Sequence, residues 1–425
     1  MLLSTDSMPP VLVDLMRREF DPGDPSRDFW AQWKNPGDVF SVLLILGGDV
    51  VARALAQLVG SGITPVAFSF GWVAYAVSAV VSAVGENKLM PLPDTSCKVI
   101  NAKSGYTRDN TSWIIGRIVR DYDEWKDEKV SKHLKSMLDA KDKFDREKAN
   151  KEVPGSSDRL KYPKQAGLCV SVYKAGQAQV GTPGYDFVYW LGFGITILQL
   201  GIAAIPCGVF GDWGIFLITV AGILLSYVTG SLPQWKEEKW ACRDKSDKDV
   251  ILTRGNGSQH AIVVLGDGKG FDLEDLAAGQ TNVDVSAPEK TRFALTGLAA
   301  LWILLLITAA GIKQNTWFLL AIGGVGILQN IFVAGKMRHP RAYGMPLALV
   351  EVIGLPKVMD TLVEVEKKYP YAGANMVDTF FPGGKLRGHE ERTWNDLAQD
   401  AAARWKAWKE SRNNPSQQNH RIQAP

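Results

Sequence analysis

Apolar residues along the chain are concentrated in six blocks, separated by stretches rich in Lys, Arg, Asp and Glu. A helix needs roughly 17 to 25 apolar residues to cross the hydrocarbon core of a bilayer. The pattern therefore predicts an α-helical integral membrane protein with six transmembrane helices. The predicted spans are residues 39–59, 63–84, 187–205, 214–232, 293–312 and 316–334.

The six spans form three close pairs, which predicts three helical hairpins. Short connections join the two members of each pair, whereas long polar segments separate the pairs. The predicted organisation is an N-terminal segment 1–37, hairpins 38–84, 186–232 and 292–335, inter-hairpin segments 85–185 and 233–291, a C-terminal helical region 336–412 and a disordered tail 413–425.

The basic residues indicate how these segments are oriented. Of the 48 Lys and Arg residues, all but Arg53 and Lys313 lie in the N-terminal, inter-hairpin or C-terminal segments or, as Arg292 does, directly before a span. Basic residues beside spans favour the cytosolic side, so we expect both termini in the cytosol, in an endomembrane or the plasma membrane. The glycosylation sequons at Asn110 and Asn256 would then remain unmodified.

Composition narrows the chemistry that the chain can support. A net charge of +3 with interspersed acidic residues does not suit nucleic-acid binding, which needs clustered positive charge. The four cysteines form no CxxC pair, and no histidine lies in a predicted span. We therefore expect no metal site and no cofactor.

A few polar residues fall inside the predicted spans. Asp49 and Arg53 are four residues apart, on one helical face, and each would cost about 2.5 to 3.5 kcal/mol at the bilayer centre. They are expected to pair and to turn toward protein, either as a structural ion pair or as a proton or ion site. Gln199, Gln329 and Asn330 are further ligand candidates, although such residues more often hold helices together.

The polar segments predict a small cytosolic α+β domain. The runs 96–102, 113–119 and 168–174 are typical of strands, and 122–151 is typical of a solvated helix. Two β-rich runs around Asn256 and Gly257 predict a hairpin, which we expect to join strands of the other segment in one sheet. Beside it, Arg254 and His260 are a candidate functional pair, though a solvated hairpin needs no such role.

The C-terminal region predicts two amphipathic helices, 357–368 and 390–411. On the second, Trp394, Trp405 and Trp408 lie on an apolar stripe flanked by basic residues. This stripe is expected either to lie on an anionic membrane surface or to pack on the cytosolic sheet. It is also a candidate surface for protein partners.

Four strings resemble a family of multi-pass membrane proteins of filamentous ascomycete fungi. They are NPGDVFSVLLILGGD at 35–49, GENK at 85–88, LPQW at 232–235 and TRGNGSQH at 253–260. The resemblance covers most of the chain except 122–151 and the tail. It implies a fungal membrane location and carries no catalytic activity.

Three classes of function follow, in this order. The first is a non-enzymatic membrane organiser or accessory protein, because no nucleophile elbow, Walker loop, metal cluster or dinucleotide fingerprint is found in the sequence. The second is a small ion-linked or proton-linked transporter or channel that uses Asp49 and Arg53. The third is a membrane-embedded enzyme.

Overall fold

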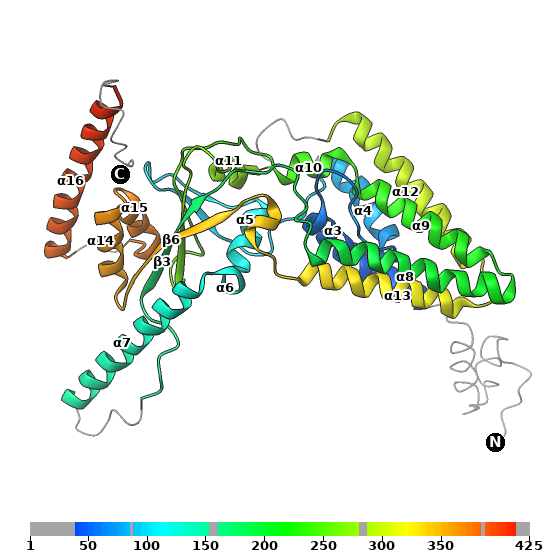
Figure 1. The fold of residues 1–425 in the computed structure, drawn as a ribbon, viewed down its shortest axis with the longest axis horizontal. Coiled ribbons are helices and arrows are strands. Elements are labelled where there is room, and N and C mark those ends of the chain that lie inside the picture. Colours follow the sequence, from blue (N-terminus) through cyan, green and yellow to red (C-terminus); the bar gives the residue numbers. More distant parts are fainter. Residues whose placement is uncertain (1–38, 86–87, 153–159, 280–286, 384–386, 414–425) are drawn as a thin grey trace, which may run out of the picture.

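The computed structural model describes residues 39–85, 88–152, 160–279, 287–383 and 387–413. A bundle of helices forms one end of the molecule, and a sheet covered by shorter helices forms the other (Figure 1). The bundle contains α3 (Val39–Leu58), α4 (Gly71–Gly85), α8 (Phe187–Phe210), α9 (Gly214–Gly230), α12 (Glu289–Ala310) and α13 (Thr316–Gly335).

Three helices of the described chain, α8, α12 and α13, are long and apolar enough to cross a membrane. A fourth is obtained only if α9 and α10 (Pro233–Lys239), which meet at a bend of 42°, are taken as one span. The 15-residue α4 is shorter. These helices are compatible with a membrane protein, but they do not support six spans in three hairpins. Side chains 39–46 of α3 lie outside the described part.

The predicted second span, 63–84, is not one helix. Residues 63–70 are extended, and only Gly71–Gly85 forms a helix. Pro65 has no backbone N–H and disfavours helical geometry in the residue before it, so it weakens a helix at this point. Hydrogen bonds from other helices then occupy the backbone groups of the extended stretch, as described below.

The sheet has the strand order β2-β1-β4-β5-β3-β6. Its strands are β1 (Lys98–Asn101), β2 (Thr107–Asp109), β3 (Leu168–Ala175), β4 (Val250–Thr253), β5 (His260–Leu265) and β6 (Leu347–Leu355). Only the β3–β5 pair is parallel, and the other four are antiparallel. The sheet therefore combines three chain segments that helices of the bundle separate.

The predicted hairpin and its pairing across two segments are confirmed. Strands β4 and β5 pair around a turn in which Gly257 adopts a φ of +82°. Strand β4 also pairs with β1, with Val99 opposite Leu252. The predicted strand at 113–119 is wrong, because Trp113–Arg120 forms helix α5, whose first turn is capped by the Ser112 side chain. Strand β6, within the region predicted as helical, was not predicted.

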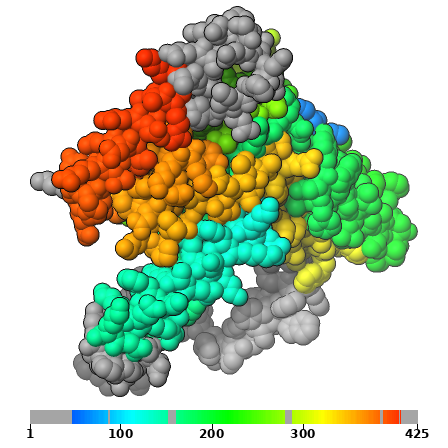
Figure 2. Space-filling model, turned by 60° about the vertical axis from the view of Figure 1, so that its left-hand side comes forward, coloured from blue at the N-terminus to red at the C-terminus, as the bar shows by residue number. Residues whose placement is uncertain are grey.

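Helices cover both faces of the sheet. Alternate strand residues, such as Val170 and Val263, pack against α14 (Val358–Lys368), α15 (Ala372–Phe380) and Trp394 of α16 (Gly388–Asn413). The other face packs against α5, α6 (Tyr122–Trp125), the start of α7 (Glu128–Glu152) and α11 (Leu273–Ala278). The rest of α7, predicted as a solvated helix, projects from the body (Figures 1 and 2).

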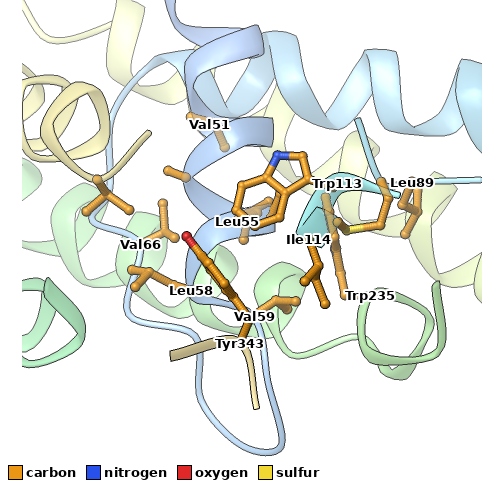
Figure 3. Close-up of a cluster of buried hydrophobic side chains, with 14 of the residues drawn as sticks. Val51, Leu55, Leu58, Val59, Val66, Leu89, Trp113, Ile114, Trp235 and Tyr343 are labelled. Carbon is orange, nitrogen blue, oxygen red and sulfur yellow. The ribbon is translucent and has the colours of Figure 1, made fainter. Parts of the chain in front are cut away.

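The core of the bundle continues into the sheet end of the molecule. Trp113 and Ile114 of α5 lie beside Leu55 and Leu58 of α3, together with Tyr343 (Figure 3). All five side chains are at most 3% exposed. The two ends of the molecule thus share one apolar core rather than a flexible connection.

Candidate functional site

The extended stretch 63–70 lies inside the bundle rather than on its surface. Ile63 at its start is half exposed, whereas Thr64, Val66, Ala67 and Phe68 are at most 1% exposed. Non-helical backbone at this depth leaves N–H and C=O groups without the partners that a helix supplies. Other elements must therefore provide hydrogen bonds to this stretch, which we call the buried non-helical segment.

Three side chains from two helices supply hydrogen bonds to the buried non-helical segment. Gln199 of α8 donates to the carbonyl oxygens of Phe68 at 2.7 Å and Ile322 at 2.9 Å. On α13, the Gln329 side-chain oxygen accepts from the Ala67 N–H at 3.2 Å. Asn330 donates to the Ala67 carbonyl oxygen at 3.3 Å. The three amides predicted within the spans thus converge on one segment.

Glycines allow the helices to approach this segment closely. A Cβ at Gly326 of α13 would lie 1.8 Å from the Phe68 carbonyl oxygen, and one at Gly192 of α8 would lie 1.9 Å from that of Pro65. A Cβ at Gly47 of α3 would lie 2.3 Å from the Gly71 Cα, where the segment turns into α4. Any side chain at these three positions would collide with backbone, so the segment is seated in grooves of small residues.

Residues 63–70 enter the bundle and α4 leaves it at the same end. Near its start, the Ser61 N–H donates to Gly181 and the Thr64 hydroxyl donates to Gly230, the last residue of α9. It turns at Gly71, halfway along α3, and α4 then returns to the sheet end. There Leu89 donates its N–H to Glu238 of α10. The extended arm and α4 together form a re-entrant hairpin.

Asp49 and Arg53 form the predicted ion pair, with Arg53 Nε 2.9 Å from Asp49 Oδ2. The Asp49 side chain is 71% exposed, so it does not turn into the bundle as expected. Arg53 also forms an ion pair with Asp94, whose side chain is nearly buried. Arg117 and Arg120 form ion pairs with the same carboxylate, and all three nitrogen–oxygen distances are at most 3.0 Å. Arg53 therefore belongs to an ionic network between α3 and α5.

Buried cations close the helix ends where the bundle meets the sheet domain. At the end of α3, Lys239 donates to Val59 O at 2.9 Å and Arg338 donates to Gln57 O at 2.9 Å. At the end of α13, Arg117 donates to Ala334 O at 2.5 Å. Each cation is at most 4% exposed. Cations at helix C-termini are favoured by the carbonyl groups left unpaired there.

Aromatic rings surround these cations. The Lys239 Nζ, whose pKa is lowered well below its usual value by burial and by the neighbouring Arg338 and Arg117, lies 4.8 Å from the ring centre of Trp240, 5.6 Å from Trp113 and 5.7 Å from Tyr343. The Arg117 guanidinium lies 4.7 Å from the ring of Trp113. Cation–π contacts partly replace the water that such charges lose on burial. We call the set Arg117, Lys239, Arg338, Trp113, Trp240 and Tyr343 the cationic junction.

Arg254 and His260 both contact the α5–α6 corner. Arg254 donates to the Val119 carbonyl oxygen at 3.1 Å, near the end of α5. The His260 ring packs edge-on against Tyr122, with ring centres 5.1 Å apart. Burial lowers the pKa of His260 to about 4, so the ring is neutral at pH 7. These contacts position helices on the sheet, and the functional pairing remains a prediction.

The C-terminal helix α16 lies at the end of the molecule opposite the bundle (Figure 1). Trp394 is 9% exposed and packs with Leu397 against the α14–α15 side of the sheet. A helix in this place cannot lie on the membrane that the bundle would cross, so the contacts favour packing on the sheet. The side chains of Trp405 and Trp408 lie outside the described part.

Neither a metal-binding group nor a known relative points to an activity. Within the described residues, no group of three or more His, Cys, Asp and Glu side chains could hold a metal ion. Comparisons with protein-family models, curated proteins and solved structures found no significant match.

Sequence reasoning missed the two features that organise the site. The re-entrant hairpin has a weak signal, since Pro65 and Gly71 bracket its extended arm. The cationic junction has none, because Lys239 and Arg338 look like ordinary basic residues beside a span. Only the tertiary structure shows that they are buried.

Proposed function

We propose that this is a multi-pass membrane protein without enzymatic activity, whose bundle crosses the bilayer and presents the sheet domain to protein partners in the cytosol. The cationic junction is the observation that supports this most. It ties the ends of α3 and α13 to the sheet domain, and α5 shares a core with α3. A domain held in this way keeps one orientation to the membrane, which suits a platform for partners.

The proposed topology has an odd number of crossings. Helices α8, α12 and α13 are long and apolar enough to cross, and in this proposal α3 and α9, which pack along them in the bundle, cross as well, while the re-entrant hairpin enters and leaves on the sheet side. Val39 then faces the side opposite the sheet, which differs from the expectation that both termini are cytosolic.

Glycosylation mapping tests this topology. A sequon tag inserted before Asp38 in the full-length chain should be modified in a eukaryotic host, because oligosaccharide is added only in the lumen. The same tag placed after Pro425 should stay unmodified and serves as the matched control. An unmodified tag at both positions would refute the odd number of crossings, and a modified C-terminal tag would refute the cytosolic sheet.

The resemblance to membrane proteins of filamentous ascomycetes sets the host for a functional test. A biotin ligase fused to the C-terminus of the full-length protein should label a reproducible set of cytosolic proteins in such a fungus. The same ligase on an unrelated multi-pass protein of the same membrane is the control. Identical labelled sets would contradict a role in organising partners.

A transporter is the second candidate, favoured by the re-entrant hairpin. Broken spans near the bilayer midplane form substrate and ion sites in many transporters. The relevant residues would be Gln199, Gln329 and Asn330, since Asp49 is exposed. Proton or cation flux into liposomes that carry the full-length protein, and not into protein-free liposomes, would replace the first proposal with this one.

A further inference from the structure

Exposed aromatic and basic side chains gather where α8 begins and α13 ends, at the end of the bundle that faces the sheet (Figure 1). Tyr185 and Trp190 are 55% and 59% exposed. Both rings pack edge-on against Tyr189, with ring centres 5.1 Å and 5.5 Å apart. We call the exposed residues Tyr185, Trp190, Lys336, Met337 and Arg341 the aromatic–basic patch.

An ion pair joins the two sides of this patch. Arg338 Nε lies 2.7 Å from Asp186 Oδ2, and the other carboxylate oxygen of Asp186 also accepts from Arg338. Asp186 is therefore neutralised from within. Among the described residues, no acidic side chain pairs with Lys336 or Arg341. The patch thus presents two exposed cations whose charge the protein itself does not offset.

Tyr185 holds its exposed ring in a strained backbone conformation. Its φ is +46°, in the left-handed region that bulky residues rarely adopt, and the preceding Gly184 has a φ of +95°. Strain of this kind persists where the surrounding structure imposes it, and it is common at binding sites. An external contact of the ring would offset its cost.

The position of the patch indicates what makes this contact. Exposed apolar side chains continue from it along α8 and α13, among them Ile197 and Ile331. Trp190 and Phe210 are exposed aromatic residues near the two ends of α8, separated by about 30 Å of helix, which is the thickness of a hydrocarbon core. The patch therefore lies at headgroup level in the proposed membrane.

The two ends of this apolar surface differ in charge. The connections at the far end, residues 211–213 and 311–315, contain one acid, Asp212, and one cation, Lys313. The sheet end instead combines aromatic rings with unpaired cations, which suits an anionic leaflet. We propose that the aromatic–basic patch binds the anionic headgroups of phospholipids in the cytosolic leaflet. This inference rests on the proposed membrane location of the bundle.

Native mass spectrometry of the full-length protein in neutral detergent tests the patch. With phosphatidylserine and phosphatidylcholine of the same acyl chains in equal amounts, the wild type should retain more phosphatidylserine. Lys336→Gln and Arg341→Gln should each lower this preference about fivefold, because each removes one cation near the anionic headgroups. Lys313→Gln, which removes an exposed cation at the far end, is the matched control and should keep the wild-type ratio.

A second pair of variants tests the aromatic part. Tyr185→Gly should weaken retention of both lipids without unfolding the protein, because glycine adopts a positive φ without strain. Tyr371→Gly is the control, since Tyr371 also has a positive φ, of +73°, but lies in the sheet domain. Equal lipid retention by these two variants would show that the Tyr185 ring does not contact lipid.

The remaining outcomes separate this inference from the proposed function. Release of the full-length protein by carbonate extraction would refute the membrane location, and the lipid site with it. A protein that carbonate leaves in the membrane, and in which Lys336→Gln with Arg341→Gln keeps the wild-type lipid ratio, would overturn the lipid site alone. If that double variant also loses proteins labelled by the C-terminal biotin ligase, the patch binds a protein instead.

Discussion

Gln199 and Phe68 are 131 positions apart in the sequence, yet the Gln199 amide donates to the Phe68 carbonyl oxygen at 2.7 Å in the centre of the bundle. Both side chains are at most 1% exposed. The contact links α8 to the arm of the re-entrant hairpin. It also replaces a hydrogen bond that a continuous helix at 63–84 would have supplied from its own backbone.

Gln199→Leu should therefore destabilise the bundle. It leaves the buried carbonyl oxygen of Phe68 without this donor, at about 1 to 3 kcal/mol, whereas the Ile322 carbonyl oxygen keeps its hydrogen bond within α13. Thermal unfolding in detergent measures the loss. Leu198→Ala on the exposed side of the same helix is the control and should melt close to the wild type. Equal melting of Gln199→Leu and the wild type would contradict the role of this hydrogen bond.

Gly326→Ala should be far more harmful than Gly324→Ala. A Cβ at Gly326 would overlap the Phe68 carbonyl oxygen, whereas one at Gly324 meets nothing within 4 Å. Overpacking of this kind costs about 1 to 3 kcal/mol or more, while Ala in an open helical position is favoured over Gly. Melting temperatures of the two variants give the comparison. Similar values would show that the segment is not seated against α13.

The ionic network predicts an order of stability loss among three substitutions. Asp94→Asn removes the carboxylate that three arginines share and should cost about 3 to 5 kcal/mol. Arg53→Leu should cost less, and Asp49→Asn least, because Asp49 is largely exposed. Detergent melts rank the three. If Asp49→Asn abolishes function in a complementation assay but keeps the melting temperature of the wild type, Asp49 belongs to an ion site rather than to a structural ion pair.

Arg338→Met should loosen the cationic junction. It removes the Arg338 ion pair with Asp186 and the donor to the Pro183 carbonyl oxygen, while the Gln57 carbonyl oxygen keeps only Lys239 at 3.3 Å, at a total cost of about 3 kcal/mol. Arg341→Met, which removes an exposed cation three residues later, is the matched control. Limited proteolysis should cleave between bundle and sheet faster in Arg338→Met alone. Equal cleavage of both variants would refute a rigid junction.

Acidification should destabilise the sheet domain through His260. Its folded pKa of about 4 is below the unfolded value of 6.5, so the unfolded chain binds the extra proton. The stability that this group contributes is present above pH 6.5 and is lost, by about 3 kcal/mol, as the pH falls to 4. His260→Gln should flatten this part of the stability profile, and the exposed His389→Gln should not. Urea unfolding across pH 4 to 7 measures both.

Short sequence patterns predicted the structural features that depend on neighbouring residues in the chain. The β4–β5 turn around Gly257 follows from its own residues, and its pairing with other strands follows from the need to cover an apolar face. The strand prediction for 113–119 was wrong because its apolar residues suit a strand or a short buried helix equally well. The hydrogen bond from the Ser112 cap favours the helix.

The re-entrant hairpin could not be predicted in the same way. Hydropathy measures the cost of placing side chains in lipid, and residues 63–84 satisfy it whether they are helical or extended. The deciding interactions come from Gln199, Gln329 and Gly326, which lie more than 100 positions away. The sequence identified the three amides as polar residues within spans, but nothing local indicated what they would bind.

The position of β3 in the sheet has a consequence for biosynthesis. Strand β3 is made before α8, yet its neighbours β5 and β6 follow only after two and four further bundle helices. Until those helices have been made, both hydrogen-bonding edges of β3 lack their final partners and are open to wrong pairing. Completion of the sheet therefore requires that all four bundle helices have been made, and ribosome-bound chains that stop before β6 should be preferred clients of chaperones.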